Sequence, residues 1–301
     1  MIKPPALKIG AIIGIVSPSS WMDTTDLYTA KTIFENRGYN LVLGESVFLK
    51  DDTYAGKPKQ RADDINAMFA NTSIDTIICA RGGYGANRVI PLLDYNLITK
   101  NPKIFIGYSD ITACLISITQ QTGLITFHGP MLSSLKNGNI DYNFTSMEKI
   151  TSGLNNIVIE SPSELPIRIL NPGKAEGQLW GGNMCLLINR LGTSDQLNTD
   201  GIILFLEDID EYLYAFDRML VHMKEAKMFH NIKGLIFGEF KNMKDQDIPF
   251  GKSADEIIME VCGELDIPII SNFPCGHGIF QATLPISAHV RLNTESDSAP
   301  L

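Results

Sequence analysis

Ser109 is the residue in this sequence that is best placed to act as a nucleophile. It follows the apolar run Ile104–Ile106 and precedes a helical pattern over Ile111–Gln121. A strand that turns sharply into a helix at a serine forms a nucleophile elbow: the turn exposes the hydroxyl, and N–H groups at the helix start can hold an oxyanion. The segment Gly-Tyr-Ser-Asp departs from the α/β-hydrolase pattern G-x-S-x-G because position 111 is isoleucine. An ordinary lipase or esterase is therefore disfavoured.

The same segment has a simpler explanation, in which Ser109 or Asp110 caps the following helix. Serine and aspartate are both favoured at helix N-termini, because their side chains accept hydrogen bonds from free backbone N–H groups. The segment alone leaves a cap and a nucleophile as open alternatives. A nucleophilic serine would also need a base, and an acid that orients this base.

Five histidines limit the search for the base. His222 and His230 lie in or just after an amphipathic helical pattern, and His289 alternates with apolar neighbours, so surface and strand positions explain these three. His128 follows a short strand pattern, and His277 follows another and lies between two glycines. Spacing in the sequence does not choose between His128 and His277.

Four acidic residues stand where an apolar strand pattern meets a helical one: Glu207, Asp208, Asp210 and Glu211. Acidic residues between a strand and a helix often serve as caps and dipole partners, which explains some of them. Glu207 is harder to explain in this way because it ends the apolar run itself. A metal site is only weakly indicated, since no histidine or cysteine lies nearby in the sequence.

The glycine-rich stretch ARGGYGANR, at residues 80–88, follows another strand pattern. It is neither a dinucleotide-binding nor a Walker sequence. We expect its backbone to approach a substrate closely, with an exposed N–H as a second oxyanion donor. The Arg81 guanidinium would suit a substrate carboxylate, and a structural role explains it equally well. Trp180 could stack on a nucleotide, and a core position is the simpler explanation.

The elements that must position these residues alternate between strand and helix, which is typical of a parallel sheet with crossover helices. Loops at residues 17–19, 81–83 and 107–109 each follow a strand pattern and would converge at the carboxyl edge of such a sheet, where ligands bind. The first half is predicted to contain strands at Ile9–Val16, Asn40–Leu43, Thr76–Cys79 and Ile104–Ile106, and helices at Thr25–Arg37, Lys59–Ala70, Asn87–Leu93 and Ile111–Gln121.

A domain boundary is indicated by Asn-, Ser- and Gly-rich sequence near Asn137–Ser163, which divides the chain into residues 1–153 and 154–301. The second half resumes the α/β alternation. It is predicted to contain strands at Ile157–Ile159, Ile167–Leu170, Ala175–Trp180, Gly201–Leu206, Gly234–Gly238 and Pro268–Ile270, and helices at Glu211–Lys227 and Ala254–Glu264.

Composition narrows the function classes. A net charge of -9 leaves no broad basic face for nucleic acid. No apolar run approaches the roughly 18 to 20 residues that span a bilayer, so we expect no membrane segment. The five cysteines are widely spaced and form no C-x-x-C pair, which favours a reducing compartment. We expect a cytoplasmic protein.

Taken together, these segments resemble the LD-carboxypeptidase family of serine peptidases, which also contains the microcin C self-immunity proteins. The resemblance extends over nearly the whole chain through IGIVSPSS, ARGGYGANRVIPLLDY, FIGYSDITACL, TFHGPM, GQLWGGNMCLL, FLEDIDEYLYAFDRML and FPCGHG. It implies a triad of Ser109, Glu207 and His277, and an oxyanion hole formed by the backbone N–H groups of Gly83 and Asp110.

The resemblance also implies a fold and an activity. The fold is an N-terminal α/β domain like class I glutaminases, with a parallel sheet, and a smaller C-terminal α/β domain of the swivelling β/β/α type that supplies the Glu and the His. The activity is hydrolysis of the amide before the terminal D-alanine of a murein tetrapeptide in cell-wall recycling. Family members are commonly homodimers that need no metal or organic cofactor.

Two other functions are consistent with the same residues. One is hydrolysis of microcin-like peptidyl or aminoacyl nucleotides, which is disfavoured because the second half is compact. The other is a non-catalytic binding protein with this two-domain shape, which the complete Ser, Glu and His set argues against.

Overall fold

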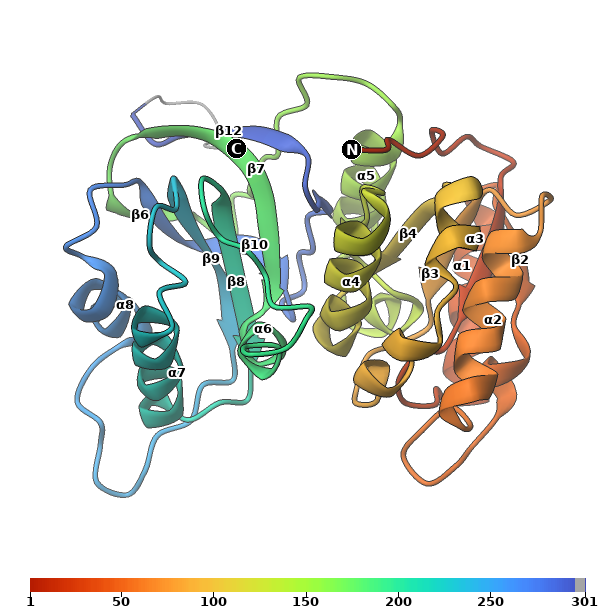
Figure 1. Ribbon diagram of the computed structural model, residues 1–301, viewed down its shortest axis with the longest axis horizontal. Coiled ribbons are helices and arrows are strands. Elements are labelled where there is room, and N and C mark those ends of the chain that lie inside the picture. Colours follow the sequence, from red (N-terminus) through yellow and green to blue (C-terminus); the bar gives the residue numbers. More distant parts are fainter. Residues whose placement is uncertain (296–300) are drawn as a thin grey trace. The chain divides into compact units, whose positions relative to one another are not determined.

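The structure is a computed structural model that describes residues 1–295 and 301. It divides into two compact units, each built on its own six-stranded sheet (Figure 1). The first unit contains Met1–Ile157 and Gln281–Ser287, and the second contains Val158–Phe280 and Ala288–Leu301. Both units combine a largely parallel sheet with helices, so the predicted α/β fold class is confirmed.

The sheet of the first unit has the strand order β11-β5-β4-β3-β1-β2, and only β5 with β11 is an antiparallel pair. The central strands are short apolar runs, as expected where helices cover both faces. The winding direction reverses between β1 and β3, so the carboxyl-end crevice lies beside these strands. The strands are β1 (Ile12–Val16), β2 (Asn40–Leu43), β3 (Thr76–Cys79), β4 (Ile104–Gly107), β5 (Phe127–His128) and β11 (Leu284–Pro285).

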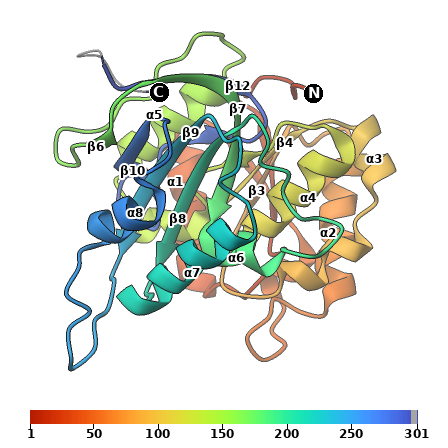
Figure 2. The same cartoon turned by 60° about the vertical axis from the view of Figure 1, so that its left-hand side comes forward.

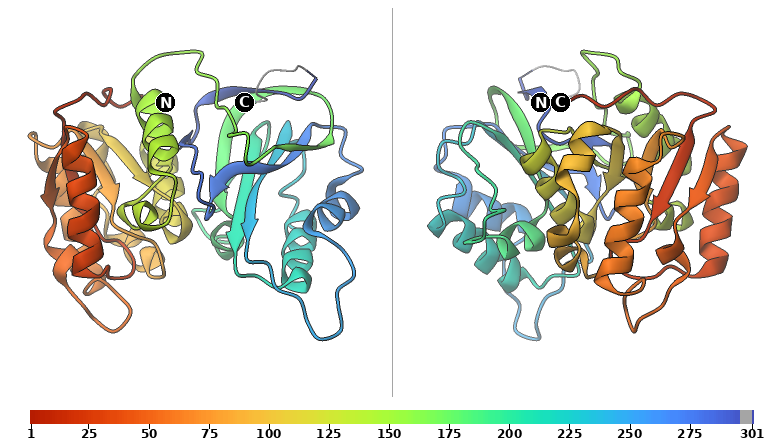
Figure 3. Two further views of the ribbon diagram at one scale, coloured as in Figure 1. Left: turned by 180° about the vertical axis from the view of Figure 1, so that it is seen from behind. Right: turned by 45° about the vertical axis from the view of Figure 1, so that its right-hand side comes forward.

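Five α-helices cover this sheet: α1 (Thr24–Asn36), α2 (Pro58–Ala70), α3 (Tyr95–Lys100), α4 (Thr112–Thr122) and α5 (Ile140–Thr151). Helices α2, α3 and α4 lie on one face (Figure 1), and α1 and α5 lie on the other (Figure 3). The connections contain the 3₁₀ turns η1 (Glu45–Phe48), η2 (Ala86–Arg88), η3 (Ile90–Leu92), η4 (Ser109–Ile111) and η5 (Leu132–Lys136).

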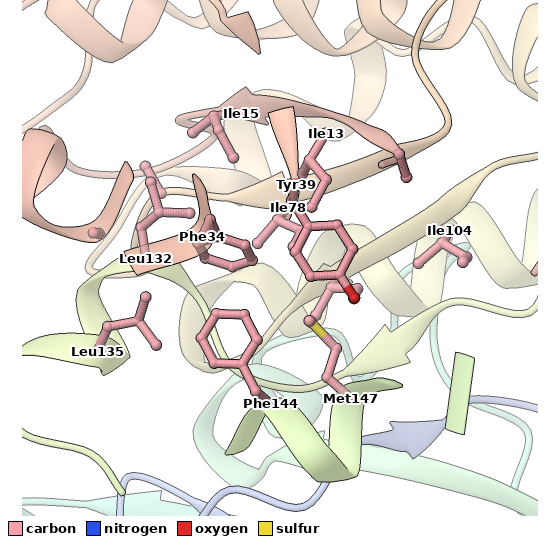
Figure 4. Close-up of a cluster of buried hydrophobic side chains, with 14 of the residues drawn as sticks. Ile13, Ile15, Phe34, Tyr39, Ile78, Ile104, Leu132, Leu135, Phe144 and Met147 are labelled. Carbon is pink, nitrogen blue, oxygen red and sulfur yellow. The ribbon is translucent and has the colours of Figure 1, made fainter. Parts of the chain in front are cut away.

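The core on the α1 and α5 side is a cluster of aliphatic and aromatic side chains (Figure 4). The Phe34 and Phe144 rings, one from each helix, meet edge to face with centroids 4.7 Å apart. Met147 of α5 and Ile13 and Ile78 of the sheet belong to the same buried cluster. This packing holds β1 and β3 in place, and the loops of the candidate site begin at the ends of these strands.

Two predictions for the first half differ from the structure. The predicted boundary region contains α5, whose first turn is capped by Asn139, and the helix is held by its buried apolar face. The predicted helix Asn87–Leu93 is instead two 3₁₀ turns, η2 and η3. Pro91 contributes to this break, because proline has no N–H to donate to the carbonyl of Asn87, four residues earlier, as an α-helix requires.

Residues 281–287 belong to the first unit, whereas the sequence-based division placed them with the second half. Within this segment β11 pairs with β5, and the Gln281 N–H donates to Asn143 Oδ1 of α5 at 2.7 Å. A two-residue strand carries almost no periodic signal, which is why the sequence did not indicate this return.

The second unit has the strand order β12-β7-β8-β9-β10-β6, in which β7 to β10 are parallel and both outer strands are antiparallel. Its strands are β6 (Arg168–Asn171), β7 (Lys174–Asn183), β8 (Ile203–Ile209), β9 (Gly234–Lys241), β10 (Ile269–Gly276) and β12 (His289–Asn293). Its helices are α6 (Met184–Asn189), α7 (Leu213–Glu225) and α8 (Ala254–Cys262), and α7 and α8 lie side by side (Figure 2).

The strand predicted at Ile157–Ile159 is not formed in the described structure, where the Ile159 N–H donates to the Leu301 carbonyl at 2.7 Å. The other predicted strands of this half are present with shifted ends. Among the described residues, no helix combines the length and the hydropathy needed to cross a bilayer.

Candidate active site

Ser109 occupies a sharp turn between β4 and α4 in the first unit. The chain is extended at Tyr108, left-handed at Ser109 with φ 62°, and helical by Ile111. A non-glycine residue with positive φ is uncommon, and strained positions of this kind gather at functional sites. The structure therefore forms the elbow that the sequence predicted at this position.

The Asp110 side chain does not cap the following helix, which was the alternative explanation for this residue. The residues that precede η4 and α4 are Tyr108 and Ile111, and in the described part of the chain neither makes a side-chain cap. The Asp110 carboxylate, which is 1% exposed, instead accepts a hydrogen bond from Ser19 Oγ at 2.5 Å and one from the Ala86 N–H at 2.8 Å. Asp110 thus connects the elbow to the loops after β1 and β3.

The glycine-rich loop after β3 lies against the elbow. A Cβ added to Gly82 would lie 2.9 Å from Ser109 Cβ and 3.1 Å from Ser109 Oγ, so only glycine allows this approach. The neighbouring Gly83 is exposed and left-handed, with φ 111°. Ser20 of the loop after β1 holds this stretch from both sides, since its N–H donates to the Gly82 carbonyl at 3.2 Å and its Oγ accepts from the Tyr84 N–H at 3.3 Å.

Arg81 and Trp180, the two residues considered for substrate binding, lie in different units. The half-buried Arg81 guanidinium donates through Nη1 to the Trp21 carbonyl at 3.2 Å, which anchors it beside the glycine-rich loop. Trp180 lies on β7 and is partly exposed, and its indole N–H donates to Gln178 Oε1 at 3.1 Å.

Glu207 and His277 meet in the second unit. Glu207 lies on β8 with no exposed surface, and His277 follows the end of β10. Their side chains are joined by a contact of 2.7 Å between His277 Nδ1 and Glu207 Oε2. Gly276, at φ 99°, makes this approach possible, because a Cβ there would lie 2.5 Å from Glu207 Oε2.

The surroundings of His277 favour its protonated form. Burial alone would lower the pKa of His277, but the charge and hydrogen bond of Glu207, together with the charges of Asp208 and Asp210, outweigh burial and raise this pKa above its ordinary value. Because a carboxylate can only accept, Nδ1 carries the proton in the neutral ring, which leaves Nε2 to accept a proton. Such a pair is equipped for general base catalysis.

Asp208, which follows Glu207 directly, has hydrogen-bond partners of its own. The buried Asp208 accepts hydrogen bonds from Asn183 Nδ2 at 3.0 Å, the Cys185 N–H at 3.0 Å and the Ile209 N–H at 2.9 Å. Burial, and the nearby charge of Glu207, raise the pKa of Asp208 to about 6. Across the described residues, no three or more His, Cys, Asp or Glu side chains are grouped so that they could hold a metal ion.

The remaining histidines have other surroundings. His128 is buried in β5, and its ring lies edge-on to Tyr108 with centroids 5.9 Å apart. His222, His230 and His289 are exposed. Of the two loop candidates from the sequence, His277 is the one that contacts Glu207.

Sequence reasoning missed Arg61 on α2. Its side chain has no exposed surface and donates to the carbonyls of Pro18 and Gly85, thereby joining the loops after β1 and β3. The signal that could have revealed it is helical periodicity, because Arg61 shares the face of the buried residues Ile65 and Met68. A cation on the apolar face of a helix needs buried partners.

Comparisons with known proteins show the family of this chain. The family description "LD-carboxypeptidase N-terminal domain" matches residues 13–129, and "LD-carboxypeptidase C-terminal domain" matches residues 176–292. A probable murein peptide carboxypeptidase of Bacillus subtilis is 35% identical over 99% of this chain and 93% of its own length. The murein tetrapeptide carboxypeptidase of Pseudomonas aeruginosa is 29% identical, with 88% of each chain covered.

A solved structure shows the same fold. MccF, the microcin C7 self-immunity protein of Escherichia coli, in complex with glutamyl sulfamoyl guanosine, matches with a TM-score of 0.91 at 27% identity, covering 96% of this chain and 95% of that one. Family matches to both halves and a full-length relative above 30% identity lead to one conclusion. The chain belongs to the LD-carboxypeptidase family of peptidases.

Proposed function

We propose that this protein is a serine-type LD-carboxypeptidase that removes the terminal D-alanine from murein tetrapeptides in peptidoglycan recycling. The observation that carries the proposal is the 2.7 Å contact between Glu207 and His277, which supplies an oriented base to the family's serine chemistry. The left-handed Ser109 supports it, because a strained elbow serves an exposed nucleophile. The murein substrate is carried over from the Bacillus subtilis and Pseudomonas aeruginosa relatives.

In the proposed mechanism, His277 takes the proton of Ser109 through Nε2 while Glu207 stabilises the imidazolium. Ser109 Oγ attacks the amide carbonyl before the D-alanine, and the backbone N–H groups of Gly83 and Asp110 stabilise the oxyanion. The imidazolium then protonates the departing amine of D-alanine, which leaves an acyl-enzyme. A water molecule deprotonated by His277 hydrolyses this ester and regenerates Ser109.

Arg81 is the proposed partner for a substrate carboxylate. Its guanidinium is held beside the glycine-rich loop by the Trp21 carbonyl, and a planar cation suits the terminal carboxylate that a carboxypeptidase must recognise. Trp180 is proposed as a second contact with the substrate, since part of its ring is exposed. We expect Arg81→Lys to raise KM more than it lowers kcat.

The proposed setting is the cytoplasm, and the proposed assembly is a homodimer. Four of the five cysteines are buried, and among the described residues none is joined in a disulfide, as suits a reducing compartment. The dimer rests on the family resemblance alone. Sedimentation at micromolar concentration tests it, and a monomer at every concentration would contradict it.

A substrate comparison tests the proposed function. Wild-type protein would be incubated separately with the tetrapeptide L-Ala-γ-D-Glu-meso-diaminopimelate-D-Ala, with the same peptide ending in L-alanine, and with an aminoacyl sulfamoyl adenosine. Mass spectrometry would follow the products. We expect D-alanine release from the first substrate only. Cleavage of the nucleotide conjugate without cleavage of the tetrapeptide would favour the MccF-like activity instead.

A further inference from the structure

The Asp110 carboxylate joins three segments that are distant in the sequence. It belongs to the elbow after β4, it accepts from Ser19 Oγ in the loop after β1, and it accepts from the Ala86 N–H in the loop after β3. These bonds are 2.5 Å and 2.8 Å long, and both end on Oδ2. Asp110 and Ser19 are both buried, with 1% and 0% of their surfaces exposed, so water does not compete for these bonds.

A buried cation completes this cluster. Arg61 donates from Nη1 to the Pro18 carbonyl and, at 3.1 Å, to the Gly85 carbonyl, in the same two loops that Asp110 joins. The opposite charges of Arg61 and Asp110 attract one another, and this attraction offsets part of the cost of burying each. A buried ion pair often stabilises a protein no more than apolar packing would, so we attribute this arrangement to the geometry of the loops that it joins.

We propose that the Asp110 side chain is a positioning residue for the oxyanion hole. Its bonds to Ser19 and Ala86 fix the position of the Gly83 N–H relative to the Asp110 N–H and to Ser109. Ser20 connects Ser19 to the Gly83 N–H. It follows Ser19 directly, and its hydrogen bonds hold the backbone on both sides of Gly83. The inference rests on the proposed function, and it adds a role for the carboxylate that is separate from the role of the Asp110 backbone.

The physical reason is preorganisation. Oxyanion donors stabilise a transition state only if they already point at the developing charge, and displacement by about 1 Å can cost about 100-fold in rate. Removing the hydroxyl of Ser19 should loosen the two loops without removing an N–H donor. The loss of activity should therefore appear in kcat rather than in KM, because the bonds to the oxyanion strengthen only in the transition state.

Two serines on one loop give a matched test. Ser17 and Ser19 are both fully buried, but within the described residues the Ser17 hydroxyl has no hydrogen-bond partner. We expect Ser19→Ala to lower kcat for D-alanine release about 10- to 100-fold with KM changed less than about threefold. Ser17→Ala should stay within about twofold of wild type. Ser19→Thr, which keeps a hydroxyl, should recover much of the loss.

A second variant keeps the inference testable if Ser19→Ala does not fold. Asp110→Ala keeps the backbone N–H and removes both accepted bonds, so its kcat should fall at least as far as that of Ser19→Ala. Circular dichroism would confirm that each variant is folded. The inference is overturned if Ser19→Ala and Asp110→Ala fold and keep wild-type kcat, or if Ser17→Ala loses as much as Ser19→Ala. Turnover by Ser109→Ala would instead contradict the proposed function, so the two failures are distinguishable.

Discussion

His277 Nδ1 lies 2.7 Å from Glu207 Oε2, and Glu207 itself has no exposed surface. A buried carboxylate in this position fixes the tautomer of the ring, holds its orientation and stabilises the imidazolium that forms during proton transfer. It also raises the pKa of His277, against the effect of burial. Each of these effects can be tested separately.

The first prediction concerns pH. His277 must be neutral to act as a base, so kcat/KM should rise with pH through the raised pKa of His277. Glu207→Gln removes the charge and leaves the burial, so the pKa should fall and the acidic limb should move to lower pH. Because Gln can hold the wrong tautomer, kcat should also fall about 10⁴-fold. Profiles from pH 5 to pH 9 check both effects.

Glu225→Gln is the control for this prediction, because Glu225 is an exposed residue of α7 and the chemical change is the same. Its profile should overlay that of the wild type. An acidic limb that stays in place in Glu207→Gln would show that Glu207 does not set the proton affinity of the base.

The second prediction concerns Gly276. An alanine there would place its Cβ 2.5 Å from Glu207 Oε2, so the histidine loop must move away from the carboxylate. We expect Gly276→Ala to lower kcat at least about 100-fold, since misplacement of catalytic groups by about 1 Å costs that much. Gly192 is also left-handed, with φ 75°, but has open space around the added Cβ. Gly192→Ala should therefore lose some stability and keep kcat.

The third prediction concerns strain at Ser109. A left-handed residue other than glycine costs about 1–2 kcal/mol. Ser109→Gly should therefore have a larger free energy of unfolding than Ser109→Ala, by about 1 kcal/mol, although both lack the nucleophile. Ser117 lies within α4, where Gly is worse than Ala by about 1 kcal/mol, so the same pair of substitutions there should show the opposite order. Urea unfolding measures all four, and equal values at position 109 would contradict the strained elbow.

The fourth prediction concerns Asp208, whose pKa is raised to about 6. The folded protein then holds this proton at pH values where the unfolded chain has lost it. The Asp208 contribution to the free energy of unfolding should therefore fall as pH rises from about 4 to 6, by up to about 3 kcal/mol. The Asp208→Asn side chain does not titrate. The free energy of unfolding of the wild type minus that of this variant should therefore fall by that amount as pH rises from about 4 to 6.

Urea unfolding at several pH values measures this difference, and the exposed Asp247→Asn serves as the control. A difference that grows with pH would mean that the Asp208 pKa is lowered rather than raised by folding.

Much of the first unit was predictable because its local signals agree with its tertiary structure. Strand β3 has the predicted bounds Thr76–Cys79, since a short apolar run between polar residues has few other solutions. Helix α5 was missed, because its polar sequence suggested a linker and its stability comes from Phe144 and Met147 packing in the core.

Part of the candidate site could likewise be predicted from the sequence, and part could not. The elbow at Ser109 could be predicted because a strand, a turn and a helix follow one another directly. The contact between Glu207 and His277 could not be derived from spacing, since 70 residues separate them and His128 was an equal candidate. The meeting of the three loops could be predicted, but the hydrogen bonds of Ser19 and Arg61 between them could not, because no local pattern shows which side chains bond there.

The most direct test of the account is the rate of D-alanine release from the murein tetrapeptide by the wild type, Ser109→Ala and His277→Ala. We predict steady release by the wild type and at least about 10⁴-fold slower release by both variants. His128→Ala, if folded, should keep the activity within about tenfold. Wild-type rates in Ser109→Ala or His277→Ala would contradict the proposed chemistry, and loss in His128→Ala alone would identify His128 as the base.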